Sequence, residues 1–349
     1  MAELDPSDVS AVAATTSKLL GMITGGWIAQ AMSVAAELKI PDLLARGAKT
    51  SEEVAHATGT HASSVYRLMR ALVTFEILRQ RPDGAFELTP MGSMLSSDAE
   101  HSVRSWAIHC ARRLSQDWRA LLDSMKTGES ARTLLIGHGM FEDLERDPEQ
   151  AAVFNQAMVE LTRLAADSIV HAYDFSAMKR IVDVGGGYGQ LLAVILKATP
   201  GARGTVFDLP HAAEQGRRYL ADNGLAERCD FVPGSFFESV PSGGDAYLLK
   251  SVIHNWNDEQ AQVILRCCKR AMGGRGKLLV VERAVPQRLD ACAAHQAIAL
   301  MDLNMLVVLG ARERTQEEFR LLLSSAGFHV TRVVPAAWNF SIIEASPAS

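Results

Sequence analysis

Apolar residues in the first half of the chain recur with the spacing of helices. From about residue 10 to residue 175 the pattern is mostly helical, and it begins with an apolar stretch through Trp27, Val34 and Leu38 that ends near Pro41. Helices of this kind would expose a large apolar patch on a monomer. We therefore expect the N-terminal helices to pair with a second copy of the chain in an intertwined homodimer.

The next segment predicts two helices and a β-hairpin. Thr50 and Glu53 form a capping-box pattern at the start of a short helix that Gly59 closes. The second helix has one continuous apolar face, which consists of Val65, Leu68, Met69, Leu72 and Val73. The turn dipeptide Asp83-Gly84 then separates two short apolar strands. Helix, turn, helix and β-wing together predict a winged-helix domain.

After about residue 178 the pattern changes to short apolar runs with helical segments between them. The runs that predict strands are 180–184, 204–207, 229–232, 246–251 and 277–281. This alternation is typical of a parallel sheet covered by helices on both faces. A helix at 315–326 and terminal strands complete the chain. The expected fold is α/β, a Rossmann-like domain preceded by a mostly helical winged-helix domain.

The length and net charge of the chain indicate the number of domains and the classes of partner that are disfavoured. The 349 residues exceed the roughly 250–300 that one core accommodates, so more than one domain is expected. A net charge of -5 provides no positive field for nucleic acid or anionic lipid. The predicted winged helix carries four arginines in and near its second helix and wing, Arg67, Arg70, Arg79 and Arg81, too few for a basic stripe. We expect it to serve in dimerisation, not in DNA binding.

The cysteines and the N-terminal sequence bear on metal binding and on cellular location. The five cysteines are odd in number and contain no C-x-x-C pair, and the neighbours Cys267 and Cys268 fit a buried helix face better than a metal site. We expect no metal. The N-terminus is acidic and no apolar run reaches about 18 residues, so we expect a cytoplasmic protein with no membrane partner.

The clearest chemistry begins at Asp183, near the end of the first strand of the second half. The run Asp183-Val-Gly-Gly-Gly-Tyr-Gly189 leads from this strand into a predicted helix at 191–198. Glycine adopts positive φ and lets a ligand approach the backbone closely. Isolated glycine runs are often ordinary tight turns, but one between a strand and a helix predicts a nucleotide-type cofactor.

Two further positions narrow the choice of cofactor. Leu192 stands where the dinucleotide fingerprint requires its third glycine, so NAD is disfavoured. Asp208 ends the next strand about 20 residues after Gly189, where a carboxylate accepts hydrogen bonds from ribose hydroxyls. Asp208 could instead cap a helix before Pro210. Its spacing from the glycine turn favours an adenosine-containing cofactor.

These motifs resemble the class I S-adenosylmethionine-dependent O-methyltransferases of the plant caffeate, bacterial polyketide, acetylserotonin and hydroxyneurosporene types. The resemblance covers nearly the whole chain and rests on Asp183-Val-Gly-Gly-Gly-Tyr-Gly189, Phe207-Asp-Leu-Pro210, Gly234-Ser-Phe-Phe-Glu238, Leu249-Lys-Ser-Val-Ile-His-Asn-Trp256 and Glu313-Arg-Thr315. It implies a winged-helix dimerisation domain at 1–100, a helical region contributing to the substrate pocket at 101–177, and a catalytic domain at 178–349.

The resemblance also implies contacts to S-adenosylmethionine. Gly185 and Gly187 would hold its methionine end, Asp208 its ribose and Phe236 its adenine. The full expected set is Asp183, Gly185, Gly187, Asp208, Leu209, Gly234, Ser235, Phe236 and Lys250. Ser235 stands where the family often has Asp, and a neutral hydroxyl binds the adenine amine more weakly than a carboxylate does.

His254 is the candidate general base. It follows the predicted strand 246–251, at the carboxyl edge where open α/β sheets bind ligands. Methyl transfer requires the acceptor oxygen to be aligned and deprotonated, and imidazole accepts protons at neutral pH. A lone histidine there is more often structural, but the resemblance assigns this role to His254. It also matches Glu282 and Glu313 to the acids that orient the histidine, whereas Asn255 replaces a frequent Asp.

The resemblance suggests a lining for the acceptor pocket: His109, Phe154, Met158, Trp256, Met301 and Met305. Methionine and aromatic side chains conform to flat apolar ligands, although core packing explains each equally well. Val307 and Val308 occupy the stretch where some family members place an Asn for a substrate hydroxyl. We expect an acceptor less polar than a hydroxycinnamate.

The sequence thus predicts an O-methyltransferase that moves a methyl group to a phenolic or enolic hydroxyl of a small, largely apolar aromatic or polyketide-like molecule. One alternative keeps the fold and the cofactor but performs decarboxylation or hydroxylation, because a fold does not dictate a reaction. The presence of His254, Glu282 and Glu313 argues against it. The other alternative is a winged-helix regulator that senses the cofactor.

Overall fold

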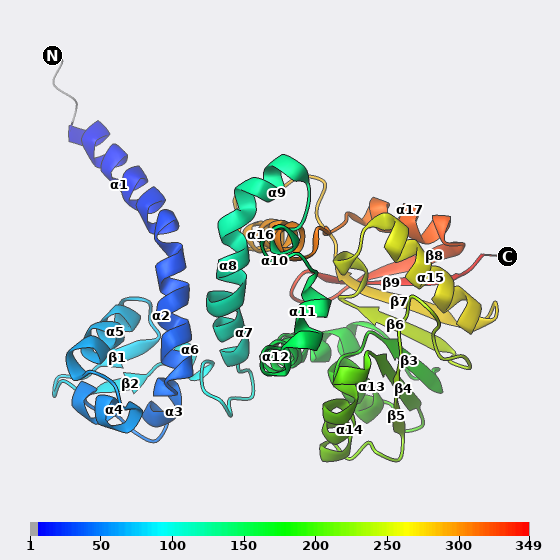
Figure 1. The fold of residues 1–349 in the computed structure, drawn as a ribbon, viewed down its shortest axis with the longest axis horizontal. Helices are drawn as coiled ribbons and strands as arrows, with labels where there is room; N and C mark the ends of the chain where they lie inside the picture. Colours follow the sequence, from blue (N-terminus) through cyan, green and yellow to red (C-terminus); the bar gives the residue numbers. More distant parts are fainter. Residues whose placement is uncertain (1–5, 349) are drawn as a thin grey trace. The chain divides into compact units, whose positions relative to one another are not determined.

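The computed structural model describes residues 6–348, which form two compact units, Met1–Ser115 and Gln116–Ser349 (Figure 1). The first unit is helical apart from one hairpin. Its elements are α1 (Pro6–Ile23), α2 (Gly25–Glu37), α3 (Ile40–Leu44), α4 (Ser51–Thr58), α5 (Ala62–Thr74), β1 (Leu78–Gln80), β2 (Phe86–Leu88), α6 (Pro90–Ser93), α7 (Arg104–His109) and the π-helix η1 (Cys110–Leu114).

The local signals in the first unit act as the sequence predicts. The Thr50 hydroxyl accepts from the N–H of Glu53, the Glu53 carboxylate accepts from the N–H of Thr50, and Gly59 ends α4 with φ of 66°. Helix α5 buries its apolar face against the antiparallel pair β1–β2. Two helices and a hairpin therefore follow one another in the expected order.

The apolar side chains of α1 and α2 are largely exposed within one chain. Leu20 is 55% exposed, Ile23 69% and Trp27 75%. Exposed apolar surface of this extent is typical of helices that pack against a partner. Among residues 6–348, no single helix is long and apolar enough to span a bilayer. Only the pair Ser10–Ile23 and Gly25–Glu37, bent by 46°, meets the length and composition test together.

The second unit is built on a seven-stranded sheet. Its strands are β3 (Arg180–Val184), β4 (Arg203–Asp208), β5 (Cys229–Pro233), β6 (Ala246–Lys250), β7 (Lys277–Arg283), β8 (Phe328–Pro335) and β9 (Phe340–Pro347), in the order β5-β4-β3-β6-β7-β9-β8. The five predicted strands are confirmed and are parallel. The sheet as a whole is mixed, because β9 pairs antiparallel with both β7 and β8. The sequence predicts the terminal strands without their direction, and the structure shows that they form an antiparallel hairpin.

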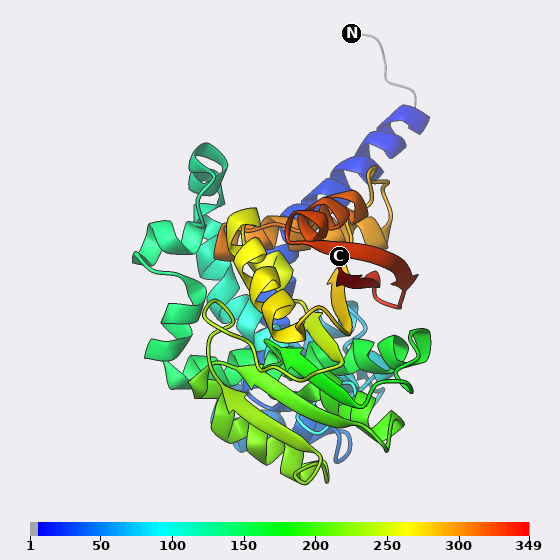
Figure 2. The ribbon, with the colours of Figure 1, turned by 90° about the vertical axis from the view of Figure 1, so that its right-hand side faces the viewer.

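Helices cover both faces of this sheet (Figures 1 and 2). The helices from residue 115 on are α8 (Ser115–Asp117), η2 (Trp118–Ala120), α9 (Leu121–Thr127), α10 (Ala131–Ile136), α11 (Met140–Arg146), α12 (Pro148–Ala172), α13 (Gln190–Ala198), η3 (Pro210–Ala212), α14 (Ala213–Asp222), η4 (Ile253–Asn255), α15 (Asp258–Met272), α16 (Ala293–Leu309) and α17 (Gln316–Ser325). Helices α12, α13 and α14 share one apolar core with the sheet, whereas α15 and α17 share another on the opposite face.

Polar contacts fix α16 to the helices that precede α12. The Ser130 hydroxyl lies within 3.2 Å of the carbonyl oxygens of Val307 and Val308, and Trp118 Nε1 donates to Asn304 Oδ1 at 3.0 Å. Because an amide oxygen that is buried needs a donor, these bonds set the rotation of α16. Helix α16 thus has a defined face toward the sheet's carboxyl edge.

Candidate active site

The glycine turn after β3 has the geometry of a cofactor cradle. Gly185, Gly187 and Gly189 have φ of 71°, 58° and 83°, a backbone conformation that residues other than glycine rarely adopt. A Cβ on Gly185 would lie 2.8 Å from Val252 Cγ2, whereas the Cβ position of Gly187 faces open space. The backbone at Gly187 is therefore accessible to a ligand, and α13 begins directly after the turn.

Asp208 holds this turn from the neighbouring strand. Its carboxylate accepts from the N–H of Gly187 at 2.6 Å and from the N–H of Leu209 at 2.6 Å. Burial raises the pKa of Asp208, although these two N–H groups partly oppose the rise. Leu209, not Asp208, is the residue that precedes the short helix η3, so the alternative of a helix cap is not what the structure shows.

Asp183 and Lys250 lie below the turn on adjacent strands. Asp183 is buried, and its burial together with the charge of Asp208 raises its pKa to about 7. Burial lowers the pKa of Lys250 to about 8, and its Nζ donates to Thr162 Oγ1 of α12 at 3.0 Å. The structure therefore brings together a carboxyl group and an amine whose charged forms are both disfavoured by burial.

Aromatic rings gather on the other side of the turn. Gly234 lies so close to Phe207 that a Cβ would approach its ring to 2.7 Å. Phe236, Phe237 and Phe141 surround Trp256, with ring centres 5.9, 4.7 and 5.4 Å away. Within the same loop, the hydroxyl of Ser235 accepts from the N–H of Phe237 at 3.3 Å. The predicted adenine residues Ser235 and Phe236 thus belong to an aromatic cluster in which Phe236 and Phe237 meet Trp256 edge to face.

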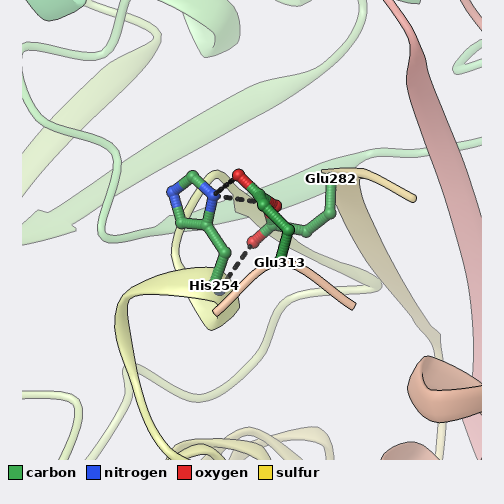
Figure 3. Close-up of side chains that lie close together, drawn as sticks. All are labelled: His254, Glu282 and Glu313. Carbon is green, nitrogen blue, oxygen red and sulfur yellow. Dashed lines mark hydrogen bonds and ion pairs between the residues drawn. The ribbon is translucent and has the colours of Figure 1, made fainter. Parts of the chain in front are cut away.

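His254 lies at the carboxyl edge of the sheet, and two buried carboxylates face the same nitrogen of its ring (Figure 3). Its Nδ1 is 2.9 Å from Glu313 Oε1 and 3.5 Å from Glu282 Oε2. Glu282 Oε1 also accepts from the backbone N–H groups of residues 252, 253 and 254. Because Nδ1 is engaged, the neutral ring has its lone pair at Nε2. The three predicted catalytic residues are thus brought together.

The charges of this cluster favour a proton on the imidazole. Burial alone would disfavour the imidazolium, but the carboxylates of Glu282 and Glu313 outweigh burial and raise the pKa of His254. Burial likewise raises the pKa of Glu282, since His254 and the backbone N–H groups only partly stabilise its charge. A proton taken up by the ring is therefore well stabilised.

The same three side chains could hold a metal ion by distance, because their ligand atoms lie within 4.8 Å of one another. Their hydrogen bonds give a simpler account. Glu282 Oε1 is bound by three N–H groups, and the 2.9 Å between Nδ1 and Glu313 Oε1 is hydrogen-bond distance. These bonds occupy one oxygen of each carboxylate, whereas Glu282 Oε2 and Glu313 Oε2 are buried and accept no hydrogen bond among the described residues.

Arg314 is a site residue whose role the sequence did not reveal. It is fully buried, and its guanidinium donates to the carbonyl oxygens of Ile253 and Trp256 and to Asp258 Oδ1. These bonds bracket His254 on both sides along the chain. Its neighbour Glu313 is positioned in turn, because its N–H donates to Asp302 Oδ1 at 2.8 Å. The Glu-Arg-Thr motif quoted above contained the signal, but not the direction of its contacts.

The predicted acceptor residues lie in both units. His109 is buried in the first unit, with its ring centre 5.9 Å from that of Trp106. In the second unit, Met158 precedes Thr162 by one helical turn and so shares its face of α12. The remaining ones are Phe154 on α12, Trp256 after η4, and Met301 and Met305 on α16, of which Met305 is buried and the others are half-buried.

The parallel strands, the glycine turn, the acid at the end of β4 and the histidine at the carboxyl edge define the class I methyltransferase fold. Residues 118–329 match the O-methyltransferase domain family, and residues 20–98 match the O-methyltransferase dimerisation domain. The chain therefore belongs to the O-methyltransferase family, as its motifs predict, and is an S-adenosylmethionine-dependent O-methyltransferase with a dimerisation domain.

Three relatives illustrate the range of this family. The phenazine O-methyltransferase PhzM of Lysobacter antibioticus is 41% identical, over 95% of this chain and 96% of the relative. An O-methyltransferase from neocarzinostatin biosynthesis, solved with S-adenosylmethionine and 2-hydroxy-5-methyl naphthoic acid, is 35% identical with a TM-score of 0.78, covering 92% and 96%. The aclacinomycin 10-hydroxylase RdmB of Streptomyces purpurascens is 35% identical, covering 91% and 87%.

Proposed function

We propose that this enzyme methylates a phenolic or enolic hydroxyl of a small, largely apolar aromatic or polyketide-like molecule, with His254 as the general base. The observation that carries the proposal is the buried His254 cluster, in which Nδ1 is engaged and Nε2 is left for the acceptor. The phenazine and naphthoic acid in the names of two relatives are acceptors or ligands of this flat aromatic kind. The half-buried methionines on α12 and α16 suit such a ring.

The chain's own residues account for the proton transfer. His254 Nε2 accepts the hydroxyl proton as the oxygen attacks, and Glu313 accepts the hydrogen bond from Nδ1 throughout. Glu282 and Glu313 stabilise the imidazolium that forms, which is the physical meaning of the raised pKa of His254. Glu282 has a second role, because its Oε1 accepts from three backbone N–H groups and so fixes the segment that carries His254.

S-adenosylmethionine would supply a methyl group on a positively charged sulfur, so the chain's residues must align the acceptor oxygen and remove its proton. The open Gly187 backbone, the buried carboxylates of Asp183 and Asp208 and the aromatic surface at Phe236 suit its methionine, ribose and adenine parts. We assign the cofactor to the nine residues predicted above, with Leu209, Gly234, Ser235 and Lys250 completing the set.

We also propose that the three segments have the roles that the sequence predicts. Residues 1–100 form a winged-helix unit that dimerises, 101–177 contribute to the acceptor pocket and 178–349 bind the cofactor. The exposed apolar side chains of α1 and α2, including Trp27, support a homodimer rather than a DNA or membrane partner. We further propose a role in cytoplasmic secondary metabolism.

One relative is named a hydroxylase, so hydroxylation is the second candidate reaction. A methyltransferase-like fold that hydroxylates or decarboxylates its ligand has no need of a base beside the methyl acceptor. In this chain His254 and both flanking carboxylates are present and mutually bonded. We therefore favour methyl transfer.

The direct experiment incubates the enzyme with methyl-labelled S-adenosylmethionine and a panel of phenols, naphthols and hydroxyquinones. We expect labelled methyl ethers, identified by mass spectrometry. His254→Ala should lower turnover by about 10²–10⁴-fold while its affinity for S-adenosylhomocysteine, measured by calorimetry, stays near wild type. Hydroxylated or decarboxylated products without any methyl ether would contradict the proposal.

A further inference from the structure

Asn304 lies on the stretch of α16 that also carries Met301 and Met305. It is only 9% exposed, although its side chain is polar. Its Oδ1 accepts a hydrogen bond from Trp118 Nε1 at 3.0 Å. An indole N–H can only donate, so Trp118 determines which end of the amide faces it and turns Nδ2 the other way. The fold therefore sets the direction of this amide.

The donor end of the amide is unused and can be reached. Within the described residues 6–348, Asn304 Nδ2 donates no hydrogen bond. It is also absent from the fully buried polar atoms that lack a partner, so part of its surface is accessible. An amide that is nine-tenths buried has lost most of its contact with water, and a bound hydrogen-bond acceptor restores what it has lost. Nδ2 therefore favours an oxygen or nitrogen atom of a ligand.

The helical position of Asn304 places it across the two methionines from the base. Successive residues of a helix are about 100° apart, so Asp302 and Asn304 lie on opposite flanks of the methionines, each about 60° from the nearer one. Asp302 accepts from the N–H of Glu313, whose carboxylate is bonded to His254. A flat ring that lies on the methionines thus has the base toward one edge and the amide toward the other.

We propose that Asn304 is a specificity-determining residue, whose Nδ2 donates to a hydrogen-bond acceptor atom on the edge of the methyl acceptor away from the reacting hydroxyl. The inference rests on the function proposed above and names a contact that selects and orients its substrate. Because Trp118 fixes the amide, the contact provides a donor, which suits a carbonyl oxygen or a ring nitrogen and not a C–H edge. The same bond keeps the ring from turning on the methionines and so holds the hydroxyl toward His254.

The test moves a single nitrogen atom around one bicyclic ring. 2-Naphthol, 3-hydroxyquinoline, 6-hydroxyquinoline and 7-hydroxyquinoline share one shape, and only the last two have the nitrogen on the ring away from the hydroxyl. We expect wild type to prefer one of these two over 2-naphthol in kcat/KM, and Asn304→Leu to lower that preference about 3- to 10-fold. Asn304→Asp keeps the size and the oxygen that Trp118 binds, and should lower the preference as well, because a carboxylate has no donor.

Two further variants isolate the role of the amide. Trp118→Phe keeps a ring but removes the N–H that fixes Asn304, so it should lower the preference by a smaller factor than Asn304→Leu. Asn223→Leu is the matched control. The Asn223 amide accepts from Lys197 Nζ and donates to the carbonyl oxygen of Tyr219, and it lies directly after α14, at the end that leads into β5. Asn223→Leu should leave the preference at the wild-type value, and thermal melts of all variants check folding at the assay temperature.

Other results overturn the inference in recognisable ways. A preference that is absent in wild type, or unchanged in Asn304→Leu and Asn304→Asp, would show that the amide does not recognise the methyl acceptor. Equal losses for all four compounds would make Asn304 merely structural. A weaker affinity of Asn304→Leu for S-adenosylhomocysteine, with an unchanged preference, would assign the amide to the cofactor.

A binding measurement separates this inference from the proposed function. The affinities of the same compounds for the complex of the enzyme with S-adenosylhomocysteine are measured by calorimetry, and they should show the same preference and the same loss in Asn304→Leu. If no compound is methylated but this pattern of binding is found, the proposed function fails and the Asn304 contact is supported. Methylation without any such pattern would support the proposed function and refute the Asn304 contact.

Discussion

We predict that binding of S-adenosylmethionine releases a proton from the carboxyl group of Asp183. The folded protein raises the pKa of this carboxyl group from 3.8 to about 7, chiefly by burial and then by the charge of Asp208. About half of the molecules therefore carry a proton on Asp183 at pH 7. S-adenosylmethionine brings an ammonium and a sulfonium, and a cation within about 4–6 Å lowers a carboxyl pKa by about 1–3 units. Binding should release about half a proton at pH 7, more at pH 6 and about a tenth at pH 8.

The same shift has a cost for stability, with a definite sign. An acid whose pKa is raised by folding stabilises the fold below pH 3.8, and this contribution is lost as the pH rises through about 7. The rise of about three units corresponds to about 4 kcal/mol. Asp183→Asn removes the charge, so the cofactor-free variant should unfold at higher denaturant concentration than wild type at pH 8.

The assay is calorimetric titration with S-adenosylmethionine in buffers of different ionisation enthalpy. The dependence of the apparent enthalpy on the buffer gives the number of protons released. Lys250, with a pKa of about 8, is about nine-tenths protonated at pH 7 and can also release protons, so the Asp183 share is measured as the difference between wild type and Asp183→Asn. Asp183→Asn should bind more weakly and release about half a proton less than wild type at pH 7. Proton release that is absent in wild type, or unchanged in Asp183→Asn, would refute the reasoning.

Three further predictions concern the base, its loop and the fold. Since the raised pKa of His254 makes activity fall as the pH drops through that value, Glu313→Gln should move the acid limb of the kcat profile to lower pH. An unmoved limb would exclude this coupling. Arg314→Lys should lower kcat by about 10²-fold, since the carbonyls beside His254 lose their donors; unchanged kcat would contradict this. Gly216→Ala should destabilise the protein by about 1–3 kcal/mol in urea unfolding, because its Cβ would lie 2.5 Å from Phe231, and an unaltered midpoint would count against that packing.

The sequence predicts the fold well where one local signal suffices. The capping box at Thr50 and the glycine turn act over a few residues, and both form as expected. The terminal hairpin of the sheet is different, because its antiparallel pairing depends on which strand lies beside β7. Alternation of strands and helices carries no information on that neighbour, and so the sequence predicts the terminal strands but not their direction.

The candidate site also combines residues that the sequence predicts with contacts that only the fold determines. His254 and its two carboxylates are predicted by their motifs and by a strand end, although they are far apart in the sequence. The contacts of Arg314 depend on which carbonyl oxygens and which carboxylate meet its guanidinium. Arginine in a sequence indicates a charge, but only the folded contacts show whether that charge is already paired.

The central claim, that His254 removes the acceptor proton, is tested most directly with acceptors of graded acidity. The rate of methyl transfer is measured for wild type and His254→Ala at one pH, with a series of substituted phenols or naphthols that share one shape. The account predicts that the loss in His254→Ala is greatest for weakly acidic hydroxyls and nearly disappears for those already ionised in solution, with equal affinity for S-adenosylhomocysteine. An equal loss for all acceptors, or none, would contradict it.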